Sequence, residues 1–275
     1  MVEKKHACAS EYRVVLVPIV MLHVGIDIMK RQQERTLFLA CKNNITKLKN
    51  CEHRRKPKLT QVSYLHDGSR AELFKYAIDT RLSDKGDLRV LDLGCGEKPY
   101  YPFFEEQTTE YVGVDIQKGT NVDIICDGEM LPLCDRAFDV VICGQVPEHL
   151  HEPRKALIGC YKVLNPLGVL FLFVPSLWPL HCAPHDFYRW TRYGIETELK
   201  RAVFDEIEVF SCGGSVSGIL QMIMFAIDGF LAKKSLVKKL LSLSIYPTLN
   251  IIGSVARQEN IESIVYYQSL CNRNA

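Results

Sequence analysis

Paired cysteines, a long uninterrupted apolar run and a strong charge of one sign are all absent from this sequence. Eleven of its 275 residues are cysteines, but they are scattered and none forms a C-x-x-C pair. Such spacing argues against a zinc site or a disulfide framework and favours a reducing cytosol. The apolar stretch from Val14 to Ile28 contains Pro18, His23 and Asp27, and it is too short to predict a membrane span. We expect a buried or interfacial helix there, with a membrane anchor as the alternative.

The charge is nearly balanced, with a formal net charge of +2, but it is unevenly distributed. Residues 1–60 contain 13 Lys and Arg against 5 Asp and Glu, whereas the remaining residues contain 21 against 27. The sequence therefore predicts a basic N-terminal extension over residues 1–60, and such leaders are more often solvated than functional. The remaining residues show no basic stripe with interleaved aromatic residues, so nucleic acid is not an expected partner.

Apolar runs alternate with helix-like segments between residues 61 and 212. One helix is predicted at 69–82, with Ser69 as its N-cap and Glu72 as the capping-box partner. Because strands that alternate with helices pair in parallel, this region predicts a core with a Rossmann-like, doubly wound α/β fold and a mostly parallel seven-stranded sheet. The expected strands lie at 89–93, 110–115, 122–125, 138–143, 168–174 and 204–210, and the other helices at 152–164 and 191–202.

The pattern changes after residue 213. Ile219 to Ala232 is apolar, and four lysines interleaved with leucine and valine follow at 233–239, which is typical of a basic amphipathic helix. We interpret residues 213–275 as a helical cap over the substrate cleft, followed by a final strand at Ile264–Leu270. Docking on a membrane or a lipid substrate is the alternative role for the same helices. Both interpretations suit a cytoplasmic protein, either free or in peripheral contact with a membrane.

Two apolar runs end in residues suited to a ligand. The run VLDLGCG supplies Asp92, Gly94 and Gly96, and the later run YVGVDI supplies Asp115. Parallel strands bring their carboxyl ends to one edge of the sheet, where glycines let the backbone approach a ligand and a carboxylate can accept hydrogen bonds from both ribose hydroxyls. Lys98 stands where a dinucleotide fingerprint would continue toward its third glycine. The spacing therefore favours a nucleoside ligand without phosphates.

Two further runs should meet the same edge of the sheet. Asp127 and Gly128 follow a short strand, and a carboxylate there could accept a hydrogen bond from an adenine amino group. A buried strand then opens onto Gln145 and the pair Glu148-His149. Each acid alone would be interpreted as a helix cap or a surface turn. Together, in this order, they favour a ligand site.

In these blocks the chain resembles the class I S-adenosylmethionine-dependent methyltransferases of the small-molecule, type-11 kind. The resemblance covers about residues 70–210 through VLDLGCG, YVGVDI, DGEMLPL, FDVVICGQVPEHL and KVLNPLGVLFLFVP. It implies S-adenosyl-L-methionine as the cofactor, with the ribose hydroxyls on Asp115, the adenine edge on Asp127 and the sulfonium end beside Gln145. The cofactor-binding residues implied by the resemblance are Asp92, Gly94, Gly96, Asp115, Ile116, Asp127, Gly128 and Gln145.

Three positions depart from the pattern of that family. Lys98 replaces the commonest third glycine, Pro147 stands where Leu is usual before Glu-His, and Leu167 replaces the first glycine of a Pro-Gly-Gly turn. We expect the change at Leu167 to be structurally harmless. By the resemblance, Pro147 lies in the loop beside the reacting methyl group, so we expect it to affect the rate of methyl transfer.

The block from Pro175 to Thr191 follows the fifth strand and resembles a sub-branch found among polysaccharide-biosynthesis enzymes. His185 beside Asp186 could act as a base that deprotonates an acceptor hydroxyl, and His149 beside Glu148 is the alternative base. A structural role is equally open for Asp186, as a helix cap, and for Arg189, as the partner of an acid. A metal held by His181, His185 and Asp186 is conceivable, but no metal is expected, since methyl transfer needs none.

The predicted function is S-adenosylmethionine-dependent methyl transfer to a small-molecule acceptor, by expectation an oxygen of a sugar, a lipid-linked compound or a quinone-like ring. The alternative is a non-catalytic cofactor-binding or interaction module of the same fold. A dinucleotide oxidoreductase is disfavoured because the third glycine is missing. The sequence predicts neither the identity of the acceptor nor an oligomeric state.

Overall fold

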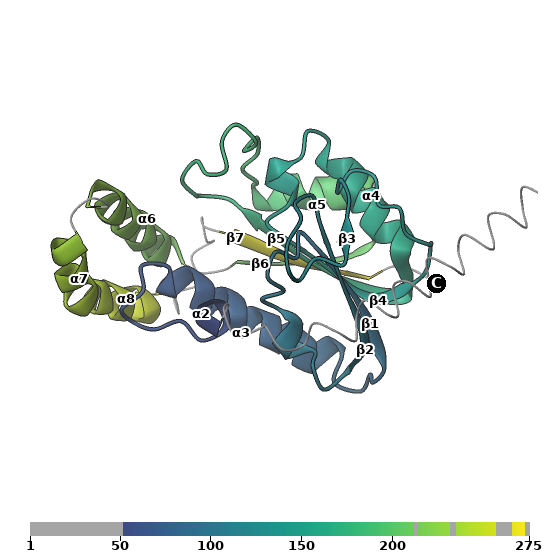
Figure 1. Ribbon diagram of the computed structural model, residues 1–275, viewed down its shortest axis with the longest axis horizontal. Helices are drawn as coiled ribbons and strands as arrows, with labels where there is room; N and C mark the ends of the chain where they lie inside the picture. The colour runs from purple at the N-terminus through teal and green to yellow at the C-terminus, as the bar shows by residue number, and fades with distance from the viewer. Residues whose placement is uncertain (1–51, 212–213, 232–234, 257–265, 273–275) are drawn as a thin grey trace, which may run out of the picture.

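The structure is a computed structural model that describes residues 52–211, 214–231, 235–256 and 266–272. Among these residues, seven strands form one sheet in the order β3-β2-β1-β4-β5-β7-β6 (Figure 1). The strands are β1 (Leu88–Leu93), β2 (Thr108–Asp115), β3 (Ile124–Ile125), β4 (Phe138–Gly144), β5 (Leu164–Pro175), β6 (Glu206–Ser211) and β7 (Tyr266–Asn272). The first five pair in parallel, and β7 lies antiparallel between β5 and β6. The predicted Rossmann-like, mostly parallel sheet is therefore confirmed.

Helices cover both faces of this sheet, as its continuous apolar strands require. α4 and α5 lie on one face and α3 on the other, while α6, α7 and α8 form a separate layer at one end (Figure 1). The helices are α2 (Glu52–Arg55), α3 (Tyr64–Arg81), α4 (Pro153–Val163), α5 (Arg192–Arg201), α6 (Ser215–Phe230), α7 (Ser235–Leu243) and α8 (Ile245–Ala256). Short 3₁₀ helices occur at η2 (Tyr101–Phe103) and η3 (Pro147–His149).

The two faces of the sheet bury separate cores because side chains alternate along each strand. In β5, Val169, Phe171 and Phe173 pack toward α3, where Phe74 is fully buried. The alternate residues of the same strand, such as Leu170, pack toward α4 and α5. Between residues 52 and 211, the six cysteines are free thiols.

The predicted start of the first helix is wrong. α3 begins at Tyr64, so Ser69 lies inside the helix, where its hydroxyl donates to the carbonyl of Leu65 (2.7 Å) instead of capping the N-terminus. Leu65 packs against the helices of the C-terminal layer. This contact with distant residues favours the additional N-terminal turn, which local capping signals do not indicate.

Two predictions concern the ends of the chain, where the structure describes only some of the residues. Residues 1–51, which include most of the predicted extension and the stretch 14–28, lie outside the described residues, so the extension stays a prediction. The final strand predicted at 264–270 is observed as β7, two residues later. Within the described ranges, no helix combines the length and the hydropathy needed to cross a membrane.

Candidate active site

The carboxyl ends of β1, β2 and β4 meet at one edge of the sheet. Leu93 in β1 is in register with Val114 in β2 and with Cys143 in β4. The turns that follow these strands therefore lie side by side. In open α/β sheets this edge is where ligands bind. The residues that the sequence analysis predicted to bind the cofactor lie at or just beneath this edge.

The turn after β1 is closed on one side and open on the other. Gly94 and Gly96 both have positive φ (72° and 46°), a conformation that side-chain-bearing residues rarely adopt. A Cβ atom built on Gly94 would lie 2.2 Å from Cγ2 of Val146, so this glycine is required for packing. A Cβ on Gly96 would meet no atom within 4 Å. The turn thus leaves free space on the side of Gly96 that a ligand can approach.

Asp115 ends β2 directly beside this turn. Its Oδ2 accepts a hydrogen bond from the amide of Gly96 (3.0 Å), and its Oδ1 accepts one from the amide of Gln117 (2.9 Å). An ionised carboxylate has about four acceptor sites, so two remain for the hydroxyls of a ribose. Ile116 follows with its side chain exposed at the same edge. Both residues are therefore accessible to a ligand at this edge.

Asp92 differs from the other acids because it is buried, with 1% of its surface exposed. It accepts a hydrogen bond from the hydroxyl of Tyr111 (2.7 Å). Burial raises the pKa of Asp92 to about 7, and the hydrogen bond from Tyr111 partly opposes this rise. The structure therefore places Asp92 beneath the glycine turn, where it supports β1 and β2 from inside the protein.

The remaining cofactor candidates lie on both sides of the turn. Asp127 accepts from the amide of Glu129 (2.9 Å) in a tight turn. A Cβ on Gly128 would be 3.7 Å from side-chain atoms of both Leu93 and Val146, so this loop packs on the ends of β1 and β4. Gln145 has a φ of 59°, and its amide donates to Phe173 of β5 (2.9 Å). The structure brings these candidates to the same edge as Asp115.

Two loops meet on the acceptor side of this edge. The Nδ1 atom of His149, in η3, lies 2.5 Å from the carbonyl oxygen of His185, in the loop after β5. The amide of Phe187 in the same loop donates to the carbonyl of Glu148 (2.8 Å). The rings of His149 and His181 lie 4.7 Å apart in an edge-to-face arrangement. The loop after β5 thus holds His149 in place.

Asp186 is paired within its own loop and does not face the ring of His185. Its two oxygens accept from Arg189 (2.6 and 2.8 Å), and its Oδ2 also accepts from the amide of His181 (2.9 Å). The hydrogen bond from Arg189 is the main reason that the pKa of Asp186 lies well below its usual range. Asp186 does not cap the helix that follows. Thr191 caps α5 instead, because its side chain accepts a hydrogen bond from the amide of Gly194. The structural role proposed for Arg189, as partner of an acid, is the one observed.

Sequence reasoning overlooked the roles of two residues at this site. His181 takes the position expected for His185, with Nδ1 3.1 Å from Oδ2 of Asp186. Glu148 is completely buried, and neither carboxyl oxygen has a hydrogen-bond partner among the described residues. Its Oε1 is 3.9 Å from Nε2 of His149. Burial raises the pKa of Glu148 to about 8. In the sequence, the position of Glu148 just after an apolar strand was the signal that could have indicated its burial.

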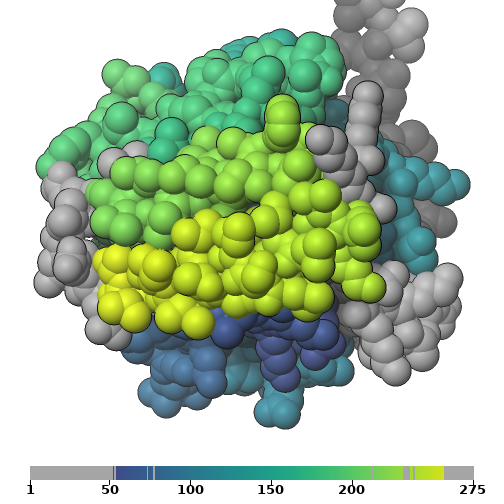
Figure 2. All heavy atoms as spheres, turned by 90° about the vertical axis from the view of Figure 1, so that its left-hand side faces the viewer, coloured from purple at the N-terminus to yellow at the C-terminus, as the bar shows by residue number. Residues whose placement is uncertain are grey.

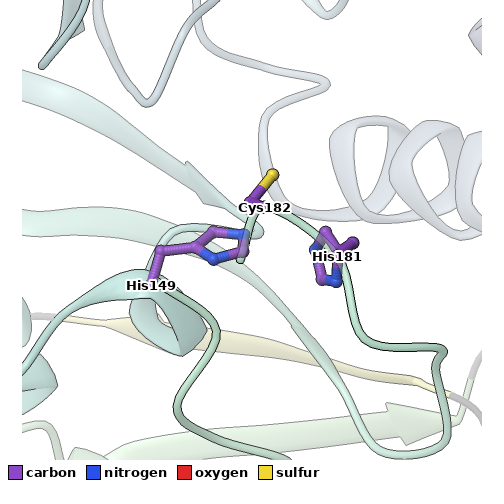
Figure 3. A group of neighbouring side chains, drawn as sticks. All are labelled: His149, His181 and Cys182. Carbon is purple, nitrogen blue, oxygen red and sulfur yellow. The ribbon is translucent and has the colours of Figure 1, made fainter. Parts of the chain in front are cut away.

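His149, His181 and Cys182 form a small group of candidate metal ligands (Figure 3). One donor atom from each lies within 4.8 Å of the others. Zinc bonds of about 2.0–2.3 Å would require tetrahedral donors to be roughly 3.3–3.7 Å apart. The group is therefore more open than a zinc site. The expectation that the reaction needs no metal stays a prediction.

Comparison with known proteins shows a common fold and a match to a methyltransferase domain. A family described as a methyltransferase domain matches residues 91–172. A ubiquinone biosynthesis O-methyltransferase of Parvibaculum lavamentivorans is 24% identical over 174 residues, which cover 53% of this chain and 68% of that protein. A thiol S-methyltransferase of Mus musculus is 27% identical over 172 residues, 54% of this chain and 70% of the mouse protein.

Two further matches concern a shorter segment and the fold. A probable S-adenosylmethionine-dependent methyltransferase of Mycolicibacterium smegmatis is 31% identical over 97 residues, 32% of this chain and 38% of that protein. The crystal structure of the cyclase SpnF superposes with a TM-score of 0.52 at 17% identity, covering 74% of this chain and 81% of that one, which shows a common fold. These matches support a class I S-adenosylmethionine-dependent methyltransferase, which the chain resembles over residues 91–172 and in its fold.

Proposed function

We propose that this enzyme methylates an oxygen atom of a small-molecule acceptor, such as a sugar, a lipid-linked compound or a quinone-like ring. The observation that carries the proposal is the position of His149, held by the carbonyl of His185 at the edge of the sheet. η3, which contains His149, begins directly after Val146, the residue that packs on Gly94. A base at this position is therefore next to the cofactor turn. The match to ubiquinone O-methyltransferases supports an oxygen acceptor.

Residues at the sheet edge fit the cofactor in specific ways. Asp115 would accept both ribose hydroxyls, Gly94 and Gly96 would admit the methionine portion, and Asp127 would accept from the adenine amino group. When bound, S-adenosylmethionine supplies a methyl carbon that is already electrophilic. The protein therefore has to hold the acceptor in line with the carbon–sulfur bond and exclude water, and orientation of this kind lowers the barrier by up to about 7–11 kcal/mol.

His149 has the features of a base for a hydroxyl acceptor. Burial lowers the pKa of His149, so its ring is neutral at pH 7. A carbonyl can only accept, so the contact with His185 requires the proton to be on Nδ1, and Nε2 then has a free lone pair. That nitrogen can take the proton of a hydroxyl as the methyl group transfers. A positioned base typically contributes about 10²–10⁴-fold.

A thiol acceptor is the second candidate, because the mouse thiol S-methyltransferase matches the chain over a similar length. The two candidates differ in how much they need a base. A phenolic hydroxyl loses its proton near pH 10 and a thiol near pH 8.5, so at pH 7 the thiol supplies far more of its ionised form. Removal of His149 should therefore affect a hydroxyl acceptor more than a thiol.

The test is a comparison of His149→Ala, His185→Ala and wild type with a catechol and an aliphatic thiol as acceptors. We expect His149→Ala to lower kcat for the catechol by about 10²-fold or more and to leave the affinity for S-adenosylhomocysteine unchanged. A loss in His185→Ala alone would assign the base to the other histidine. Equal turnover of the catechol in all three proteins would contradict base-assisted oxygen methylation, and turnover of the thiol alone would establish the second candidate.

A further inference from the structure

The C-terminal helical layer is firmly attached to the core along one side. α6 and α8 pack on the first turns of α3, and a small buried cluster forms between them. Gly253 of α8 lies so close to α3 that a Cβ atom would be 2.5 Å from Cδ1 of Leu65. The side-chain amide of Asn250 donates to two backbone carbonyls in the segment before α3 (2.7 and 3.0 Å). The layer therefore has a fixed orientation relative to the sheet.

The other side of this layer is apolar and exposed. In α6, exposed apolar residues recur at intervals of three, four and seven, which places them in one stripe along the helix. Phe230 at the end of this stripe is 82% exposed. α6, α7 and α8 make up much of the end of the molecule that faces the viewer in Figure 2. We call the following residues the outer apolar face: Val216, Ile219, Ile223, Phe230, Leu236, Val237, Leu240, Leu243, Ile245, Ile251, Ile252 and Val255.

The size of this set calls for an explanation. Single exposed apolar side chains are common, but soluble monomers rarely expose a contiguous group of large ones, and such groups mark sites of protein or membrane contact. The charges of the same segment indicate which contact. Between residues 215 and 256 the sequence contains four lysines, all at 233–239, and one acid, Asp228. That acid accepts a hydrogen bond from the hydroxyl of Tyr246 (3.2 Å).

We propose that the outer apolar face docks in the plane of a membrane surface that contains anionic lipid. Apolar side chains would enter the boundary between headgroups and acyl chains, and the exposed Lys239 of α7 would lie near the lipid phosphates. Helices with this composition bind membranes through apolar burial and electrostatic attraction together. A second copy of the chain is disfavoured as occupant, because a two-fold contact through this face would place the lysine-rich segments of both copies within or beside one interface. α6, α7 and α8 are 16, 9 and 12 residues long, which is too short to span the bilayer and agrees with binding in plane.

The docked helices also contact the acceptor side of the active site. Phe225 of α6 packs edge-to-face on Trp178, with ring centroids 4.6 Å apart. Trp178 belongs to the loop after β5, and Arg189 of that loop donates to its carbonyl (3.1 Å). A membrane bound at the outer apolar face would therefore lie near the loop that holds His149. The inference about docking stands independently of which acceptor is methylated.

The experiment is sedimentation of the full chain with vesicles. Phosphatidylcholine vesicles are compared with vesicles that also contain phosphatidylglycerol, each at low and high salt. We expect binding to the anionic vesicles that weakens with salt, because screening reduces attraction between exposed charges. Leu236→Gln with Ile251→Gln removes two apolar side chains from the face without changing the charge. We expect this double variant to bind the anionic vesicles at least about tenfold more weakly than wild type does.

The matched control is Tyr193→Gln with Val203→Gln, which alters two exposed apolar residues outside the layer. We expect the control to bind vesicles like wild type, and both double variants to keep the wild-type melting temperature and affinity for S-adenosylhomocysteine. The proposal is overturned if wild type does not bind anionic vesicles. It is equally overturned if the Leu236 and Ile251 variant binds as wild type does, since residues 1–51 or another surface would then be responsible. Loss of a dimer in that variant with unchanged vesicle binding would instead assign the face to a second copy.

Discussion

The ammonium group of Lys98 forms a buried ion pair with the carboxylate of Asp123, and this pair joins the glycine turn to the loop between β2 and β3. The same carboxylate accepts from the amide of Gly113 (2.7 Å). A Cβ on Gly113 would lie 2.4 Å from Cε of Lys98 and 2.7 Å from Sγ of Cys95. Gly113 is therefore small because the lysine stem crosses β2 at this point. Lys98, which differs from the residue usual in the family, therefore connects the glycine turn to the neighbouring loop. The absence of a side chain at Gly113 makes room for it.

Removal of the lysine should destabilise the protein strongly. In Lys98→Met the carboxylate of Asp123 would stay buried without its cation, which typically costs about 3–5 kcal/mol. Lys98→Met with Asp123→Asn removes both charges, and we expect it to recover most of that loss. The free energy of unfolding in urea checks both variants. Equal destabilisation of the single and the double variant would show that the stem of the lysine matters more than its charge.

The positions of most strands and the ligand edge of the sheet could be predicted from the sequence because they depend on local features, whereas the strand order, with β7 between β5 and β6, depends on long-range pairing and was not predicted. Apolar runs locate the strands, and Gly94, Gly96 and Asp115 follow them at the required points. The start of α3 could not be predicted, because the packing of Leu65 on α8 joins residues far apart in the sequence. The partner of Asp186 also depends on how the loop after β5 folds. Local spacing suggested His185, whereas the fold brings His181 and Arg189 to it.

Asp115→Ala should weaken cofactor binding. Each hydrogen bond to a charged group contributes about 1.5–3 kcal/mol, so the loss of two acceptor positions for the ribose predicts at least a hundredfold weaker affinity. The substitution also frees the amide of Gly96, which loosens the turn. Isothermal titration with S-adenosylhomocysteine measures the effect, and Asp84→Ala, at an exposed acid in the loop before β1, is the control. Unchanged affinity in Asp115→Ala would contradict the assignment of the ribose site.

Glu148 should make stability depend on pH in a defined direction. Its pKa is raised from 4.5 to about 8 in the folded protein, so the folded state keeps a proton that the unfolded chain has lost. Its contribution is therefore fully present below pH 4.5 and is lost as the pH rises through 8. Across this window it lowers the free energy of unfolding by up to about 1.4 kcal/mol per pH unit.

Glu148→Gln keeps the shape of the neutral acid without a titrating proton, so it isolates this contribution. We expect the variant to gain stability relative to wild type as the pH rises from 5 to 8, measured by urea unfolding at each pH. Subtraction of the two curves removes the effect of Asp92, which titrates in both proteins. Glu152→Gln, at an exposed position nearby, is the matched control. A constant difference between wild type and Glu148→Gln would show that Glu148 is ionised in the folded protein throughout.

Asp186→Ala should distinguish a positioning role from a catalytic one. The substitution leaves Arg189 without its bidentate partner and the amide of His181 without its acceptor. Because 27% of the Arg189 side chain is exposed, we expect the loss to be smaller than the roughly 3–5 kcal/mol typical of a fully buried pair. Because this loop holds His149, we expect a lower melting temperature together with a lower kcat. The pH dependence of kcat, which reports the base, should keep its shape. Asp186→Asn retains an acceptor for His181 and should recover part of the stability and of the turnover in parallel. If the pH profile of either variant loses the limb assigned to His149, then Asp186 itself takes part in proton transfer.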